Sequence, residues 1–140
     1  MKEGAEMKVA STSERLKQIM EQRNLQQVDI LTLCKPYCEQ YGVPLRKNDI
    51  SQYVNGKHEP NQKKLTVLAK GLKVSETWLM GYDVDPFENN KVLQEIMNKV
   101  LLLDSFDQGR VVGQIDEMLK DPKYHKNDLK TSKGDSSITA

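Results

Sequence analysis

Residues 50–60 read ISQYVNGKHEP, a stretch whose spacing decides the fold class. Ile50, Tyr53 and Val54 recur at three- and four-residue intervals, which predicts the buried stripe of a short helix over residues 46–54. The Asn-Gly pair that follows predicts a tight turn. The outer face of this helix is then polar, and it consists of Lys47, Asn48, Ser51 and Gln52.

Helical patterns also precede this stretch. Residues 11–14, Ser-Thr-Ser-Glu, form a capping-box pattern, so we expect a first helix to begin there. A second helix is expected to start near Gln26 or Gln27. It either ends or kinks at the residue before Pro36, or Pro36 opens an extra turn that Gly42 closes.

Two further helices are expected after the Asn-Gly turn. Asn61 is placed to cap a fourth helix, whose apolar residues recur at helical spacing. Ser75 is placed to cap a fifth helix, in which Trp78 is the large core residue. The chain up to Asp83 is therefore expected to form an all-α domain of five helices.

A second block follows a change in composition. Residues 83–90, DVDPFENN, are polar, acidic and interrupted by proline, so a linker is expected over residues 84–90, after the first domain ends at Asp83. Two short helices joined at Asp104 and Ser105 are expected over residues 91–120 as a helical hairpin. Ser105 and Gln108 have the spacing of a capping box for the second of these helices.

The two rear helices carry broad apolar stripes. A single helix pair has no third layer in which to bury both stripes, so we expect residues 91–120 to form the interface of a homodimer. The side chains expected in this interface are Val92, Leu93, Ile96, Met97, Val100, Leu101, Val111, Val112, Ile115, Met118 and Leu119. Residues 121–140 lack periodicity and are expected to be a disordered tail.

The composition excludes several classes of protein. With 140 residues, 37% of them hydrophobic, and a mean hydropathy of -0.67, the chain can build only a modest core, which excludes a large enzyme fold. No apolar run approaches the ~20 residues of a membrane helix, and residues 1–10 contain no apolar stretch of signal-peptide length, so a cytoplasmic protein is expected. Cys34 and Cys38 are expected to be free thiols. No metal is expected, because zinc requires about four ligands and only His58 and His125 could join the two cysteines, and no cofactor is expected either.

The charge is concentrated in one part of the chain. The whole sequence has 21 Lys and Arg against 20 Asp and Glu. Residues 43–73 contain seven basic residues against two acidic ones, which leaves +5. A cluster of this kind is often only a solvated face, but it is also what nucleic-acid binding requires.

The polar face of the helix over residues 46–54 has the chemistry of a DNA reader. The major groove, ~12 Å wide, admits one helix, and its floor presents donors and acceptors. Asn48 and Gln52, four residues apart, have amide side chains that can pair with adenine. Arg46 or Lys47 can reach guanine or a phosphate.

The flanking pattern resembles a known family. With LQQVDIL before it and LTVLAKGLKVSETWLMGYD after it, ISQYVNGKHEP resembles the helix-turn-helix domain of the Xre family. The longer spacing between the second and third helices makes it most similar to CI-type repressors of temperate phages of Gram-positive bacteria. The resemblance covers residues 11–83 and implies a five-helix, lambda-repressor-like domain.

The resemblance also implies roles for individual residues. It implies that Gln27 meets a phosphate and braces the third helix, and that Lys47, Asn48, Ser51 and Gln52 face base edges. The residues that it implies to meet the DNA backbone are Asn55, Lys57 and His58.

Three positions depart from the family pattern. Leu31 stands where the family usually has alanine, extra residues fill 35–44, and Lys73 stands where glycine commonly ends the fourth helix. The resemblance therefore does not give the angle between the second and third helices.

Two functions are compatible with these features. The first is a transcriptional repressor, not an enzyme, that binds double-stranded operator DNA as a homodimer. Some related repressors carry a self-cleaving peptidase domain, but residues 91–120 are too few for one, so control by an antirepressor or other regulatory protein is favoured. The second is an antitoxin or antirepressor-like module whose rear helices bind a different protein.

Overall fold

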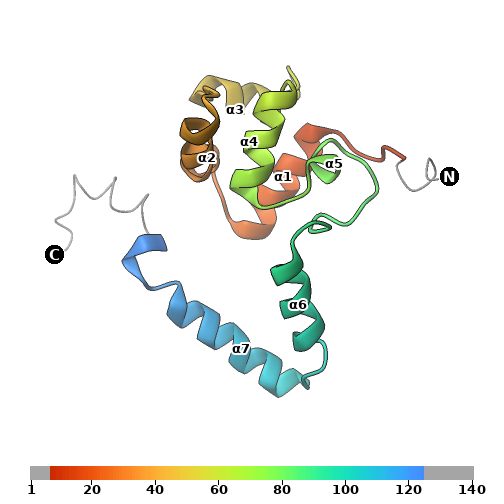
Figure 1. Cartoon of the computed structure of the whole chain (residues 1–140), viewed down its shortest axis with the longest axis vertical. Coiled ribbons are helices and arrows are strands. Elements are labelled where there is room, and N and C mark those ends of the chain that lie inside the picture. The colour runs from red at the N-terminus through yellow and green to blue at the C-terminus, as the bar shows by residue number, and fades with distance from the viewer. Residues whose placement is uncertain (1–6, 125–140) are drawn as a thin grey trace. The chain divides into compact units, whose positions relative to one another are not determined.

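The computed structural model describes residues 7–124, and this part of the chain is all-helical. The predicted all-α class is confirmed, because the described residues contain helices and no strand, apart from one isolated bridge between Lys8 and Tyr82. The helices are α1 (Thr12–Arg23), α2 (Gln27–Tyr41), α3 (Lys47–Val54), α4 (Gln62–Leu72), α5 (Glu76–Leu79), α6 (Lys91–Val100) and α7 (Ser105–Met118), followed by a 3-10 turn, η2 (Pro122–Tyr124) (Figure 1).

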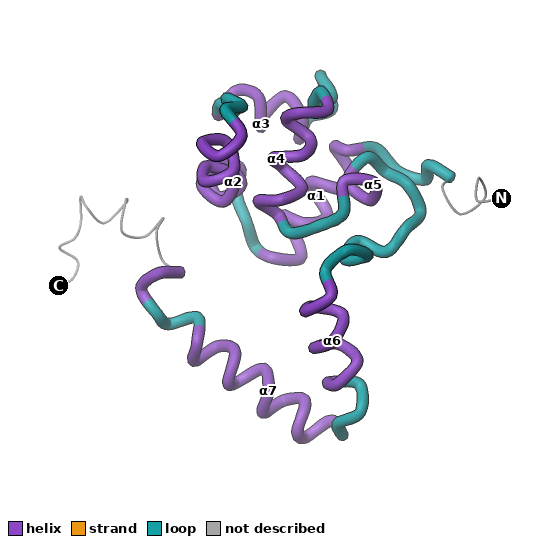
Figure 2. Tube along the Cα trace, viewed as in Figure 1, coloured by secondary structure: helices purple, strands orange, loops and turns teal. Residues whose placement is uncertain are grey.

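The chain divides into two compact units. The first extends to Lys91 and contains α1 to α5, and the second begins at Val92. Within the first unit, α4 packs on α2 and α5, α1 packs on α3 and α5, and α2 packs on α3. The tube in Figure 2 shows these five helices gathered into one bundle.

The first three helices begin in a similar way. At α1, the hydroxyl of Ser11 accepts from the N–H of Glu14 at 3.1 Å, and the Glu14 carboxylate accepts from the N–H of Ser11 at 2.9 Å, which confirms the predicted capping box. At α2, Asp29 accepts from the N–H of Gln26 at 2.8 Å. At α3, Asp49 accepts from the N–H of Arg46 at 2.9 Å. Each carboxylate satisfies an amide that the helix itself leaves open.

The caps predicted for α4 and α5 are also confirmed. Oδ1 of Asn61 accepts from the N–H of Lys64 at 2.9 Å, and Oγ of Ser75 accepts from the N–H of Trp78 at 3.2 Å. Between these caps, the apolar stripe of α4 faces inward. The core of the first unit consists of Leu16, Ile19, Ile30, Cys34, Val43, Ile50, Tyr53, Val54, Leu65, Val67, Leu68, Ala69, Leu72, Trp78 and Leu79.

Helix α2 continues through a proline. The sequence left open whether the helix stops before Pro36, and that alternative is wrong, because α2 extends to Tyr41. Gly42, with φ of 65°, ends the helix and donates its N–H to the carbonyl of Cys38. Pro36 is exposed, so its ring lies on the outer side of the helix, while Ile30 and Cys34 are buried on the inner side. Helix α2 also packs on α4, and these contacts stabilise it on the side opposite to Pro36.

Residues 84–90, predicted to be a linker, are bound to the first unit. The N–H of Ser75 donates to the carbonyl of Pro86 at 2.6 Å, and Oγ of Ser75 donates to Glu88 at 3.0 Å. Val84 packs against the core. The boundary between the units therefore lies at Lys91, because the polar segment uses its carbonyl and carboxylate groups to bind the start of α5.

The residues before α1 also belong to the first unit. The N–H groups of Val9 and Ala10 donate to the carbonyl of Gly81 at 2.8 and 3.1 Å. The guanidinium of Arg15 lies 4.4 Å from the ring centroid of Trp78 and donates to the carbonyl of Tyr82 at 3.2 Å. The backbone of Val9 and Ala10 is thus fixed beside the turn that follows α5.

The second unit differs from the expected hairpin. Asp104, not Ser105, caps α7, because its carboxylate accepts from the N–H of Asp107 at 2.8 Å. Nε2 of Gln108 donates instead to the carbonyl of Val100 at 2.9 Å, so it joins α7 to the end of α6. The two helices do not pack along their lengths. The predicted tail begins with η2, and residues 125–140 lie outside the described residues.

The structure also bears on membrane insertion. Among residues 7–124, no helix has both the length and the apolar character needed to cross a membrane.

Candidate nucleic-acid interface

Helix α3 presents two chemically different faces. Ile50, Tyr53 and Val54 are buried, as their spacing predicted. Lys47 and Asn48, in the first turn, are exposed. The side chains of Lys47 and Asn48 are therefore accessible to solvent at the amino-terminal end of the helix.

The other two residues expected on the outer face are only half-buried. These residues are Ser51 and Gln52. The loop after α3 folds back on the helix, since the N–H groups of Lys57 and His58 donate to the carbonyl of Gln52 at 2.9 and 3.4 Å. Ser51 accepts from Nδ2 of Asn55 at 3.4 Å, a weak contact.

The loop itself is open to solvent. Asn55, Lys57 and His58 are all exposed, and Gly56 adopts φ of 76°, a left-handed conformation that glycine accepts without strain. The hydroxyl of Ser13 donates to the carbonyl of Val54 at 2.6 Å, so the start of α1 holds the end of α3.

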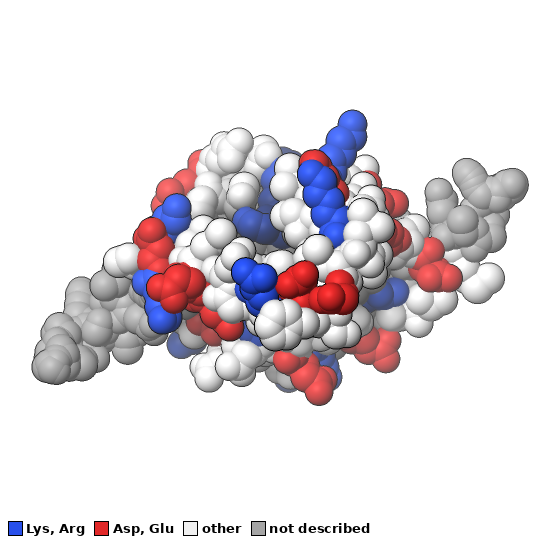
Figure 3. All heavy atoms as spheres, turned by 90° about the horizontal axis from the view of Figure 1, so that it is seen from below, with Lys and Arg blue, Asp and Glu red and all other residues white. Residues whose placement is uncertain are grey.

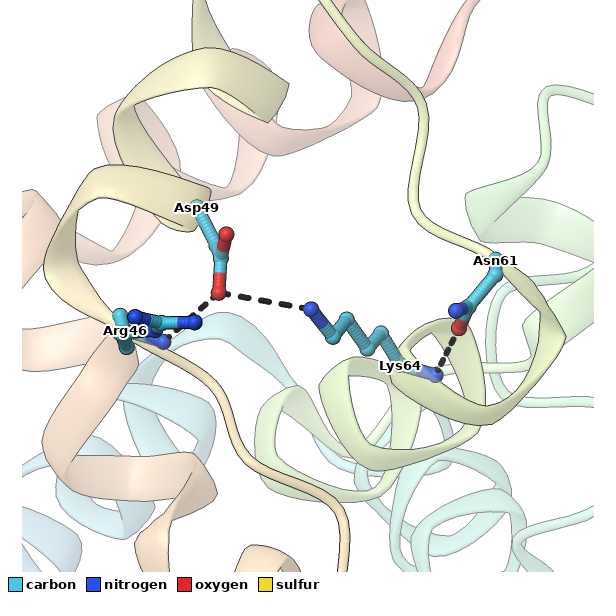
Figure 4. Close-up of polar contacts among 4 residues, drawn as sticks. All are labelled: Arg46, Asp49, Asn61 and Lys64. Carbon is cyan, nitrogen blue, oxygen red and sulfur yellow. Dashed lines mark hydrogen bonds and ion pairs between the residues drawn. The ribbon is translucent and has the colours of Figure 1, made fainter.

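An ion pair holds the other end of α3. Oδ2 of Asp49 accepts from the backbone N–H of Arg46 and lies 3.5 Å from Nζ of Lys64 on α4. Figure 4 shows how Asn61 caps the same turn of α4 from which Lys64 extends. The hydrogen bond from Arg46 and the charge of Lys64 hold the pKa of Asp49 below its ordinary value, against the opposing effect of desolvation. The residue stays ionised at neutral pH.

The remaining residues of the expected interface flank α3. Gln27 lies in the first turn of α2 and is half-buried, and Arg46, which precedes α3, is exposed. Helices α2 and α3 pack on each other, so these two residues belong to neighbouring elements.

Positive charge around α3 is local. Of the seven basic residues in 43–73, Lys64 is paired with Asp49. Lys47, Lys57 and Lys63 are exposed. In the view of Figure 3, which does not face α3, Lys and Arg side chains lie among Asp and Glu side chains.

The second unit exposes an apolar surface. Of the residues expected in a dimer interface, Leu93, Val100 and Val111 are half-buried. The others are exposed, and these are Val92, Ile96, Met97, Leu101, Val112, Ile115, Met118 and Leu119. Leu102 and Phe106, which the sequence analysis missed, are 86% and 76% exposed. Leu102 lies in the longest apolar run of the chain, a signal that could have identified it.

Three residues that position α3 were also missed. Asp49 stands three residues after Arg46, the spacing of a capping box, and this signal was available in the sequence. Lys64 and Ser13 lie on other helices, so no local pattern connects them with α3.

Two observations concern metal binding and cysteine chemistry in the described residues. Among residues 7–124, no group of three or more His, Cys, Asp or Glu side chains is placed to hold a metal ion. Burial raises the pKa of the Cys34 thiol to about 12, with a further contribution from Cys38, so this thiol is not a nucleophile at neutral pH.

The chain matches no protein-family model, and no curated protein is significantly similar to it.

Proposed function

We propose that this chain is a sequence-specific, DNA-binding transcriptional repressor of the phage CI type. In this proposal the first unit is a lambda-repressor-like helix-turn-helix domain, with α2 and α3 as its two characteristic helices. The protein acts in the cytoplasm without a cofactor or enzymatic step.

One observation carries the proposal. Helix α3 has a buried inner face, and its exposed first turn carries a cationic and an amide side chain, Lys47 and Asn48. A helix inserted in the major groove needs this combination, because the amide can pair with a base edge and the cation can approach guanine or a phosphate. The exposed loop that follows, with Lys57 and His58, suits contact with the DNA backbone.

The salt dependence of DNA binding tests this function. Each phosphate neutralised by a lysine contributes about -0.9 to the slope of log affinity against log salt concentration. We expect a steep negative slope for the full chain on duplex DNA, and a slope that is shallower by about one phosphate contact for Lys57→Ala. An affinity that does not change between low and physiological salt would overturn the proposal.

We further propose that the second unit makes the protein a homodimer. Its apolar side chains are exposed on both α6 and α7, and a gathering of exposed apolar side chains is typical of a protein interaction site. A dimer engages two half-sites about 34 Å apart, so the second contact gains from the high effective concentration.

The same apolar surface favours one alternative. It can dock a different protein, in which case the chain is an antitoxin or antirepressor-like module and its DNA contacts are secondary. Sedimentation of the full chain alone distinguishes the two. The repressor is expected to sediment as a dimer, and a stable monomer would favour the alternative.

A further inference from the structure

The ion pair between Asp49 and Lys64 joins two helices that both pack on α2 but differ in their second packing partner. Helix α3 packs on α1 and α2, whereas α4 packs on α2 and α5. The carboxylate of Asp49 lies 3.5 Å from Nζ of Lys64 and links the first turn of α3 directly to the first turn of α4 (Figure 4). Both side chains are shielded from solvent, since they are only 21% and 23% exposed.

The contacts continue on both sides of the pair. The same oxygen of Asp49 accepts from the N–H of Arg46 at 2.9 Å, and the N–H of Lys64 is fixed by Asn61 at 2.9 Å. A chain of contacts therefore fixes the backbone from which Arg46, Lys47 and Asn48 project. At the opposite end, the hydroxyl of Ser13 holds the carbonyl of Val54.

Asp49 is electrostatically unfavourable on a helix that approaches DNA. It is the only acidic residue in α3, and phosphates would repel its charge. Charge alone therefore predicts that its removal would strengthen binding to every duplex. Base reading has a different requirement, because side chains must be held to within about 0.5 Å of their productive positions.

We propose that the Asp49–Lys64 pair is a positioning brace that fixes how the first turn of α3 meets the major groove and thereby sets the discrimination between DNA sequences. This inference rests on the proposed function. Asp49 touches no base in this account and acts through Arg46, Lys47 and Asn48.

Asp49→Asn tests the brace by the sign of its effect. The amide oxygen of asparagine can still accept from the N–H of Arg46, but the ion pair is lost. Two probes are used, a duplex that the wild-type protein selects from a random-sequence pool and a scrambled duplex of the same composition. The measured quantity is the ratio of the affinity for the selected duplex to the affinity for the scrambled duplex. The brace predicts that Asp49→Asn lowers this ratio by about fivefold. Phosphate repulsion alone predicts that both affinities rise together.

Lys64→Met separates the brace from a direct phosphate contact by Lys64. The brace predicts that this substitution lowers the ratio in the wild-type background and has little further effect in the Asp49→Asn background. A phosphate contact predicts equal losses on both duplexes and in both backgrounds. Lys64→Arg, which can still pair with Asp49, should restore the ratio.

Lys63→Met is the matched control, because Lys63 is the exposed neighbour of Lys64 on α4. This substitution should weaken binding to both duplexes equally and leave the ratio of the two affinities unchanged. Far-UV circular dichroism establishes that each variant keeps its helices. If Asp49→Asn loses its helices, Lys64→Met alone tests the brace, because that substitution leaves the hydrogen bond between Asp49 and Arg46 at the start of α3 intact.

Two results would overturn the inference in distinguishable ways. An unchanged or increased ratio in Lys64→Met and Asp49→Asn would show that the pair does not position α3, and would leave the proposed function standing. A wild-type protein that selects no duplex from the pool would overturn the proposed function and the brace with it.

Discussion

At the scale of single residues, Asp49 combines two structural tasks. Its carboxylate caps α3 and also pairs with Lys64 on α4. Both contacts favour the ionised form, so the pKa of Asp49 is lower in the folded chain than its ordinary value.

This lowered pKa predicts a pH dependence of stability. A carboxylate with a depressed folded-state pKa stabilises the fold above its unfolded pKa of about 3.9, and the contribution is lost as pH falls through the folded value. The free energy of unfolding of the wild type should therefore exceed that of Asp49→Asn near neutral pH, and this difference should shrink as pH falls below about 4. Urea unfolding across this pH range measures the difference.

Glu95→Gln provides a matched control, because Glu95 forms an exposed ion pair with Lys99 in the second unit. It should change the free energy of unfolding by less than about 0.5 kcal/mol at every pH. A difference between wild type and Asp49→Asn that stays constant from neutral pH to pH 2 would contradict the role assigned to Asp49.

The sequence predicts the exposed residues of α3 only in part. Helical periodicity places Lys47, Asn48, Ser51 and Gln52 on one side, and the first two are exposed as expected. Ser51 and Gln52 are half-buried, and the following loop folds back at this end of the helix and donates its amides to the carbonyl of Gln52. Periodicity gives the angle of a side chain around the helix, but it carries no information on how a neighbouring loop covers it.

At the scale of elements, the close crossing of α2 and α4 depends on Gly71. A Cβ atom at this position would lie 2.6 Å from Sγ and 2.9 Å from Cα of Cys34. The backbone of α2 cannot move away cheaply, so Gly71→Ala should destabilise the first unit by about 1–3 kcal/mol. Chemical denaturation followed by Trp78 fluorescence measures this change.

Gly109→Ala is the corresponding control. Gly109 lies in α7, and a Cβ atom there would meet nothing within 4 Å. Alanine is the better helix former by about 1 kcal/mol, so this substitution should leave unfolding of the first unit unchanged and not destabilise the second. If Gly71→Ala proves as stable as the wild type, α2 and α4 do not cross as closely as described.

The helices were predictable from the sequence where local signals agree. Ser11, Asn61 and Ser75 cap their helices as expected, because a cap depends on residues within one turn. Two competing local signals gave errors. One expectation was that α2 could end before Pro36, yet α2 continues through this residue to Tyr41 and packs against α4. The other was that Ser105 caps α7, whereas the cap is Asp104, one residue earlier.

At the scale of the whole molecule, the boundary between the units determines which fragments fold. Ser75 binds Pro86 and Glu88, so residues 84–90 complete the first unit. A fragment of residues 1–91 should therefore keep its helices, sediment as a monomer and bind the selected duplex far more weakly than the full chain. A fragment of residues 1–82 should unfold at a lower temperature than residues 1–91.

Analytical ultracentrifugation and thermal unfolding of the two fragments check these expectations. If residues 1–91 dimerise and bind the duplex with the affinity of the full chain, the dimer interface lies in the first unit. The rear helices would then be better explained as a docking site for a different protein. Equal melting temperatures would show that residues 84–90 do not contribute to the first unit.

Sequence reasoning identified the apolar stripes of the second unit but could not define its arrangement. The stripes follow from the spacing of side chains along α6 and α7. Packing between the two helices depends on contacts between residues far apart in the sequence, which a local pattern does not contain. The expected linker illustrates the same limit, since its polar composition does not reveal its hydrogen bonds to Ser75.

The most direct test of the proposed function compares Asn48→Ala with Lys57→Ala on the selected and scrambled duplexes. If α3 reads bases in the major groove, Asn48→Ala should weaken binding to the selected duplex by about 1–3 kcal/mol and leave binding to the scrambled duplex unchanged. Lys57→Ala should weaken binding to both duplexes alike. Equal losses for Asn48→Ala on the two duplexes would contradict the account, because they would show that the exposed turn of α3 does not distinguish one sequence from another.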